Sequence, residues 1–170
     1  MKDYLNHVIE TIAAHSRDFE KAGLEPPQTI DIYMGQPNNP DDFEFTLPAV
    51  FIEYAADYDG ETFDLILHVV QDFGTDTENF SPERTKGLEY ITFLSVLKRC
   101  LYGLKMRPVF NPLRLYQETP MPPDSFFYHT LTFRCNFDTE LYSEQSRYTD
   151  VSPVIPVLEN GRLKETMQGV

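Results

Sequence analysis

The stretch Phe126-Phe-Tyr-His-Thr-Leu-Thr-Phe-Arg-Cys-Asn-Phe-Asp138 alternates between two sets of side chains almost without interruption. A period of two places the two sets on opposite faces of one long strand. We expect one set to be buried and the other to be largely solvated. The buried set is Phe127, His129, Leu131, Phe133, Cys135 and Phe137. The solvated set is Phe126, Tyr128, Thr130, Thr132, Arg134, Asn136 and Asp138.

Two further β-rich runs, residues 49–56 and 62–71, flank Asp59-Gly60, a residue pair favoured in two-residue hairpin turns. Closing a turn there predicts three pairs on one face of the hairpin and two on the other. A slip of one residue would turn Glu53 and Asp64 into the core, so the register should be well specified. The predicted pairs are Val50 with Val69, Ile52 with Leu67, Tyr54 with Leu65, Phe51 with His68 and Glu53 with Ile66.

Two amphipathic helices are predicted to pack on this sheet. Asp3 can cap the first, and Gly23 lies where a left-handed residue would end it. Ser81 can cap the second, with Pro82 at its first position and Gly103 near its end. The apolar stripe of the first helix is Leu5, Val8, Ile9, Ile12, Ser16 and Phe19. That of the second is Leu88, Ile91, Leu94, Leu97, Leu101 and Leu104, widened by Phe93, Val96 and Cys100.

Short strands are expected near residues 29–34 and 113–118, with a long surface loop over residues 35–48. These elements predict an α+β fold, in which a mixed or antiparallel sheet of about five strands has two helices packed on one face. We expect residues 1–142 to form a single domain. Residues 143–170 would form an extended C-terminal arm, with a small hairpin around Asn160-Gly161 that pairs Val157-Leu158 with Arg162-Leu163.

The charge balance narrows the possible partners. The 170-residue chain has a net charge of −13, from 27 acidic and 14 basic side chains. Such a chain repels phosphate backbones and anionic membranes, so we expect neither sequence-specific nucleic-acid binding nor a membrane partner. The sequence shows no apolar run long enough to span a bilayer and no secretory leader. Two isolated cysteines, Cys100 and Cys135, are typical of buried free thiols in a reducing cytoplasm.

The candidate chemical sites do not meet the requirements of catalysis or of metal and cofactor binding. His129 and Cys135 are six residues apart on one strand face, roughly 20 Å, so they do not share a zinc ion with His68. The cluster Asp57, Asp59, Glu61 and Asp64 departs from calcium-loop spacing. The acidic residues Asp41, Asp42 and Glu44 lie in a loop rich in Pro and Asn, which suits a solvated or partner-facing rim better than acid–base catalysis.

Some apolar residues fall where solvent is expected. Phe43 and Phe45 flank Glu44 in the acidic loop, and Phe126 and Tyr128 begin the solvated side of the long strand. We therefore expect Phe43, Phe45, Phe126, Tyr128 and, beside them, Arg134 to contact another subunit or a partner protein.

The order helix, short strand, hairpin, long helix, short strand, long strand resembles the α+β fold of phage tail terminator or tail-completion proteins. The resemblance is carried by four segments in residues 1–142: Leu47–Tyr54, Leu67–Asp72, Cys100–Leu104 and Leu131–Cys135. It implies a non-enzymatic structural protein that caps the tail tube as a homo-oligomeric ring, commonly a hexamer. It further implies tail-tube and head–tail connector proteins as partners, and a location first in the cytoplasm and then in the virion tail of a phage or prophage.

Two other classes of protein stay open at this point. One is a cone-shaped α+β domain with a small-molecule pocket, similar to the nuclear-transport-factor-like or cystatin-like superfamilies. A catalytic member would need a His–Asp or Tyr–Asp pair on the concave face, whereas the expected neighbours of His129 are Phe127, Leu131 and Phe133. The other class is an adaptor protein that forms no ring.

Overall fold

A five-stranded sheet forms the centre of the computed structural model, which describes residues 1–72, 84–105, 108–121, 126–143, 157–159 and 162–164. The strand order is β1-β2-β3-β5-β4, and β1 is parallel to β2 whereas all other neighbours are antiparallel. The sheet is therefore mixed, and the α+β class is confirmed. The strands are β1 (Thr29–Ile32), β2 (Ala49–Asp57), β3 (Thr62–Asp72), β4 (Arg114–Pro120) and β5 (Phe126–Asn136).

The hairpin of β2 and β3 has the predicted register, because all five predicted pairs are present. The turn itself differs from the two-residue turn that the sequence favours. Asp57 is the last paired residue of β2, and its carboxylate accepts the backbone N–H groups of Asp59 and Gly60 at 3.1 and 3.0 Å. The left-handed residue is Glu61, with φ of 49°, and not Gly60. An Asx-type loop of four residues has replaced the tight turn.

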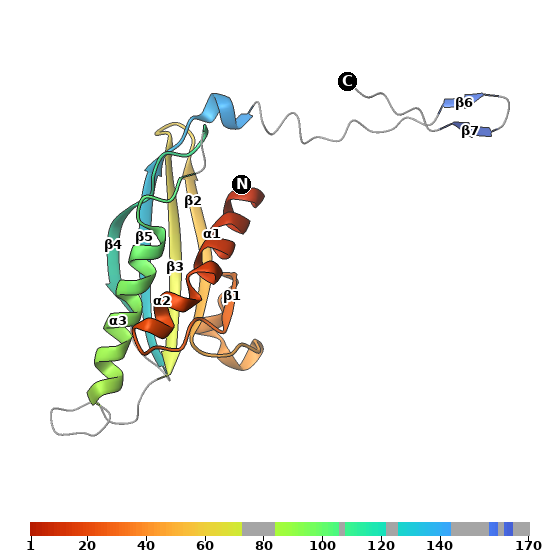
Figure 1. Ribbon diagram of the computed structural model, residues 1–170. Helices are drawn as coiled ribbons and strands as arrows, with labels where there is room; N and C mark the ends of the chain where they lie inside the picture. Colours follow the sequence, from red (N-terminus) through yellow and green to blue (C-terminus); the bar gives the residue numbers. More distant parts are fainter. Residues whose placement is uncertain (73–83, 106–107, 122–125, 144–156, 160–161, 165–170) are drawn as a thin grey trace.

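Helices α1 (Lys2–Ala14), α2 (Ser16–Lys21) and α3 (Arg84–Leu101) lie on one face of the sheet (Figure 1). The first predicted helix is two helices, α1 (Lys2–Ala14) and α2 (Ser16–Lys21), which break at His15. At the break, the His15 ring bonds the Thr11 carbonyl and the Ser16 hydroxyl donates to the Ala13 carbonyl, so side chains take acceptors of the helical ladder. The predicted Asp3 cap is wrong, because Asp3 lies inside the first turn. Gly23 does end α2 in the left-handed region, with φ of 75°.

The long helix α3 (Arg84–Leu101) packs on the sheet through the predicted stripe from Phe93 to Leu101, but at its start the buried side is rotated from the predicted one. The periodicity predicts that Leu88 and Ile91 are buried, but they are 55% and 58% exposed, whereas Tyr90 is 3% exposed. The residues that pack are Tyr90, Phe93, Leu94, Val96, Leu97, Cys100 and Leu101. Tyr90 holds this rotation because its hydroxyl bonds Nδ1 of His129 at 2.7 Å and its ring stacks on Phe127.

The main core lies between the helices and the sheet. From β5 it contains Leu131, Phe133 and Cys135, as the alternation predicts. Phe137 continues this face beyond the strand and forms an isolated bridge with Phe110. The aromatic rings of Tyr4, Phe63, Phe110 and Phe137 close the core at this end of the sheet. The face assignment of the long strand is therefore correct on its buried side.

The sheet face turned away from the helices, here called the far face, is only partly solvated. The alternation predicts that Phe126 and Tyr128 are exposed there, but they are 8% and 6% exposed. They belong to a second apolar cluster with Ala49, Phe51 and Val70. Tyr33, Phe45, Leu47 and Met121 pack against this cluster, so one end of the far face is covered by the chain itself.

A separate two-stranded hairpin, β6 (Val157–Glu159) with β7 (Arg162–Lys164), follows the sheet in sequence, with Leu158 opposite Leu163. The arm expected between the domain and this hairpin, residues 144–156, lies outside the residues that the structure describes. The Ser81 cap with Pro82 also lies outside them.

Candidate interaction surface

The segment of residues 33–47, here called the covering segment, is held on the far face by polar as well as apolar contacts. It contains two short 3₁₀ turns, η1 (Gln36–Asn38) and η2 (Pro40–Asp42). The buried Gln36 side chain donates to the Ile32 carbonyl at 2.8 Å and accepts the Met34 N–H at 2.7 Å. Phe45 packs edge-on against Phe51, with ring centroids 5.2 Å apart. The loop that the sequence predicts to be a solvated or partner-facing rim is thus held on the sheet near both of its ends, at Gln36 and at Phe45.

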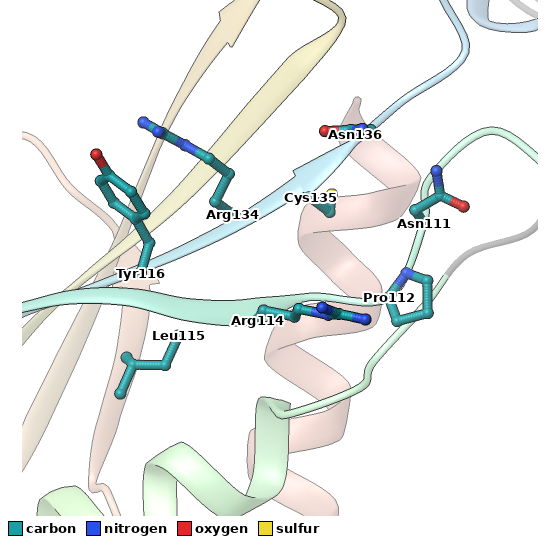
Figure 2. A pocket seen from close by; sticks show the side chains of 8 residues that line it. All are labelled: Asn111, Pro112, Arg114, Leu115, Tyr116, Arg134, Cys135 and Asn136. Carbon is teal, nitrogen blue, oxygen red and sulfur yellow. The ribbon is translucent and has the colours of Figure 1, made fainter.

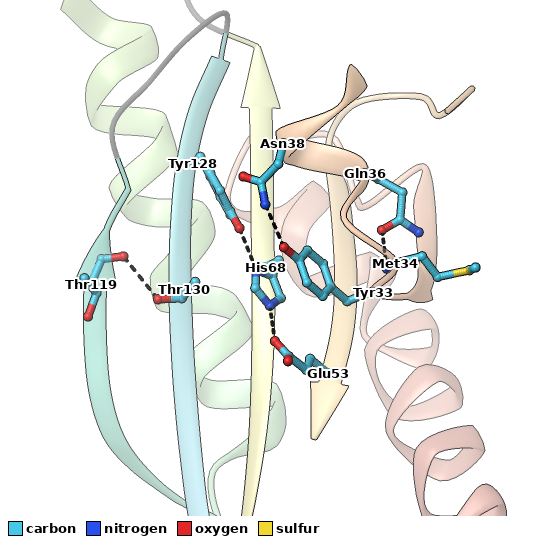
Figure 3. Close-up of polar contacts among 9 residues, drawn as sticks. All are labelled: Tyr33, Met34, Gln36, Asn38, Glu53, His68, Thr119, Tyr128 and Thr130. Atoms are coloured by element: carbon cyan, nitrogen blue, oxygen red, sulfur yellow. Dashed lines mark hydrogen bonds and ion pairs between the residues drawn. The ribbon is translucent and has the colours of Figure 1, made fainter. Parts of the chain in front are cut away.

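A hydrogen-bonded chain crosses the far face beneath this segment (Figure 3). His68 of β3 bonds the Glu53 carboxylate through Nε2 at 2.8 Å and the Tyr128 hydroxyl through Nδ1 at 2.7 Å. The Tyr33 ring stacks flat on the His68 ring, with centroids 3.7 Å apart and planes 4° apart. Tyr33 belongs to the covering segment, so this stack links the segment to the chain, and within the segment Asn38 donates to the Tyr33 hydroxyl at 2.8 Å.

This arrangement is built to fasten the covering segment. Burial lowers the pKa of His68, although the neighbouring Glu53 opposes the change. A neutral His68 donates a hydrogen bond to Glu53 through Nε2 and accepts one from the Tyr128 hydroxyl through Nδ1, so both ring nitrogens are occupied. His68 is 6% exposed, and neither the 570 Å³ nor the 210 Å³ cavity of the protein is lined by His68 or Glu53. Both His68 ring nitrogens therefore have partners within the fold, whereas the Glu53 carboxylate stays partly exposed.

At the other end of the far face, Arg134 is clamped between a carboxylate and an aromatic ring. Its guanidinium donates two hydrogen bonds to Asp64, at 2.6 and 2.7 Å. The same group lies 3.7 Å above the centroid of the Tyr116 ring. The register of β4 against β5 shifts between Leu115 and Gln117, and a bulge of this kind re-aims the intervening Tyr116 side chain. Bidentate pairing with Asp64 raises the pKa of Arg134, so the cation is permanent.

A cavity of about 570 Å³ opens beside this clamp (Figure 2). Figure 2 shows Tyr116 and Arg134 on one side of the sheet and Leu115 on the side of α3. Arg114 lies on the same wall, directly opposite Arg134 in the strand register. Unlike Arg134, Arg114 is exposed and has no ion-pair partner among the described residues. The cavity therefore presents one uncompensated cation to an anionic group.

On the helix side, His129 contributes no metal site. Burial lowers its pKa, and its Nδ1 accepts a hydrogen bond from the Tyr90 hydroxyl. Within the described parts of the chain, no three His, Cys, Asp or Glu side chains are close enough to hold a metal ion. Of the helices described here, none is both long and apolar enough to cross a membrane.

The structure divides the five residues expected at an interface into three groups. Phe126 and Tyr128 are buried by the covering segment, so the expectation that they face solvent is wrong for the single chain. Phe45 is half-buried against them. Phe43, in the covering segment, and Arg134, on β5, keep partial exposure.

Sequence reasoning missed Arg114 and Tyr116, because a bulge in a short edge strand has no reliable sequence signal. It also missed Tyr33, which lies two residues before a glycine in what looks like the end of a strand. No protein-family model matches the chain, and a search of curated proteins finds no match.

Proposed function

We propose that this chain is a structural protein of a phage or phage-like tail that caps the tail tube as a ring and joins it to the head connector. The observation that carries the proposal is the open edge of the sheet. Strand β4 ends the strand order, and every residue of it except Thr119 is exposed. Tyr116 and Leu115 in this strand are 59% and 37% exposed.

An exposed edge strand of seven residues with apolar side chains is a site for association with another chain. Rings form through heterologous contacts, in which one surface of a subunit meets a different surface of the next. The two edges of this sheet are formed by different strands, β1 and β4, which suits a heterologous contact. The net charge of −13 supports the role as well, since an acidic lumen lets DNA pass without binding it.

The alternative of a small-molecule-binding domain receives less support. It would place a carboxylate–histidine pair at the wall of a cavity. Here the Glu53–His68 pair is on the far face, and the Tyr33 ring covers the His68 ring. The polar chain thus serves to hold the covering segment, and this leaves protein–protein association as the function that the exposed surfaces favour.

The test is the mass of the assembly in solution. Size-exclusion chromatography with light scattering should give a closed multiple of the 19.7 kDa subunit, and negative-stain microscopy should show rings. A chain that stays monomeric up to millimolar concentration would overturn the autonomous ring. A dimer that does not grow further would instead support the adaptor class.

A further inference from the structure

The cavity beside β4 has the chemistry of a carboxylate-binding site. Arg114 and Arg134 are cross-strand neighbours, and Asp64 neutralises only Arg134. The Tyr116 ring and the Asp64 carboxylate hold Arg134 in place. Asp64 is on β3, so it neutralises Arg134 from the side away from β4, and Arg114 on β4 keeps its charge. The amides of Asn111 and Asn136 also line the cavity and offer neutral donors. Guanidinium groups bind carboxylates through paired, charge-assisted hydrogen bonds.

The opposite edge of the same molecule has the complementary charge. Asp41, Asp42 and Glu44 are exposed in and after η2. The covering segment that contains them follows β1, the edge strand opposite β4, and lies on that side of the sheet (Figure 1). None of the three carboxylates has a basic partner among the described residues. Phe43 between them is half-buried, so an aromatic side chain lies within the acidic stretch. An uncompensated cation at one end of the strand order thus matches uncompensated anions at the other.

We propose that the Arg114 cavity of one subunit binds the acidic loop, residues 41–44, of a neighbouring copy of this chain. Because the two surfaces are different and lie at opposite sheet edges, the contact is heterologous and propagates from subunit to subunit. This inference rests on the proposed ring, since it requires self-association. It names the residues of the contact, and it adds the prediction that assembly weakens as salt rises.

Charge reversal tests the contact directly. Arg114→Glu should weaken self-association at least tenfold, because the introduced carboxylate would face the acidic loop of the neighbour. The double change Asp42→Arg with Glu44→Arg should do the same from the other side. Arg17→Glu, on the exposed surface of α2, is the matched control and should leave assembly unchanged. Circular dichroism should show all of these variants folded, since the altered side chains lie outside both apolar clusters.

Combining the reversals distinguishes a specific contact from a general charge effect. A chain that carries Arg114→Glu together with Asp42→Arg and Glu44→Arg should assemble within threefold of the wild type. Mixing the two separately reversed chains in equal amounts should also restore assembly, because the introduced carboxylate of one chain then meets the introduced arginines of the other. Analytical ultracentrifugation gives the dissociation constants.

The outcomes separate this inference from the function on which it rests. A wild type that assembles while Arg114→Glu behaves like Arg17→Glu would overturn the contact and leave the ring intact. Assembly that is lost in each reversal and not regained in the combined chain would overturn the pairing of these two surfaces. A wild-type chain that remains monomeric would overturn both.

Discussion

Truncating Phe126 tests whether the covering segment really closes one end of the far face. The Phe126 side chain is 8% exposed and lies in the second apolar cluster, with the Phe45 ring 6.3 Å away. Replacement by Ala removes roughly 120 Å² of buried apolar surface, or about 3 kcal/mol at about 25 cal/mol per Å². This figure is the lower end of the usual cost of about 3–5 kcal/mol for Phe→Ala in a core. We expect the lower end because a loop can partly collapse into the space.

Urea denaturation followed by circular dichroism measures the effect. With a slope of about 2 kcal/mol per molar urea, a loss of about 3 kcal/mol lowers the midpoint by about 1.5 M. Ile91→Ala is the matched control, because Ile91 is 58% exposed on α3 and its truncation should cost within about 0.5 kcal/mol. If Phe126→Ala costs no more than Ile91→Ala, the far face is solvated at this end and the second cluster does not form.

Two further predictions concern the buried titratable groups. Burial lowers the pKa of His68 below 6.5, so the unfolded chain binds more protons than the folded chain as the pH falls through that value. The free energy of unfolding should therefore decrease as the pH decreases, by at most about 1.4 kcal/mol per pH unit. His68→Gln should reduce the difference between the free energies of unfolding that urea titrations give at pH 7 and at about pH 5.5. Part of the difference should remain, because burial lowers the pKa of His129 as well. An unchanged difference would contradict the burial of His68. Burial raises the pKa of Cys100 and of Cys135 to about 11, so neither thiol should react rapidly with a disulfide reagent at about pH 8 until urea is added, and fast reaction of the native protein would refute their burial.

The register of the β2–β3 hairpin and the two faces of β5 were predictable because their signal is local. Alternation in β5 and in the β2–β3 hairpin fixes which side chains share a face, and a slipped register would bury Glu53 or Asp64. The rotation of α3 was not predictable in the same way. Leu88 and Ile91 are as apolar as the residues that pack, and a helical period alone does not choose between two overlapping stripes. The choice is made by Tyr90, which needs a polar partner and finds His129 across the core.

The covering segment escaped prediction for a different reason. Residues 35–48 are irregular and rich in Pro and Asn, so they have no period that would reveal a buried side. Their placement depends on tertiary contacts, chiefly the stack of Tyr33 on His68 and the packing of Phe45 on Phe51. The apolar character of Phe126 and Tyr128 was the correct signal that something covers them. In the structure, that cover comes from the same chain.

This division of the far face determines where a subunit contact can form in the proposed ring. The end that contains Phe126 is already occupied, and uncovering it would remove the Tyr33 ring that stacks on His68 and the Phe45 ring that packs on Phe51. The Arg134 end and the outer edge of β4 remain open. A neighbouring subunit would therefore meet the sheet at this edge, and the acidic part of the covering segment would be the surface offered in return. Thus the segment that closes one end of the sheet in its own subunit also supplies the charges for the open edge of the next.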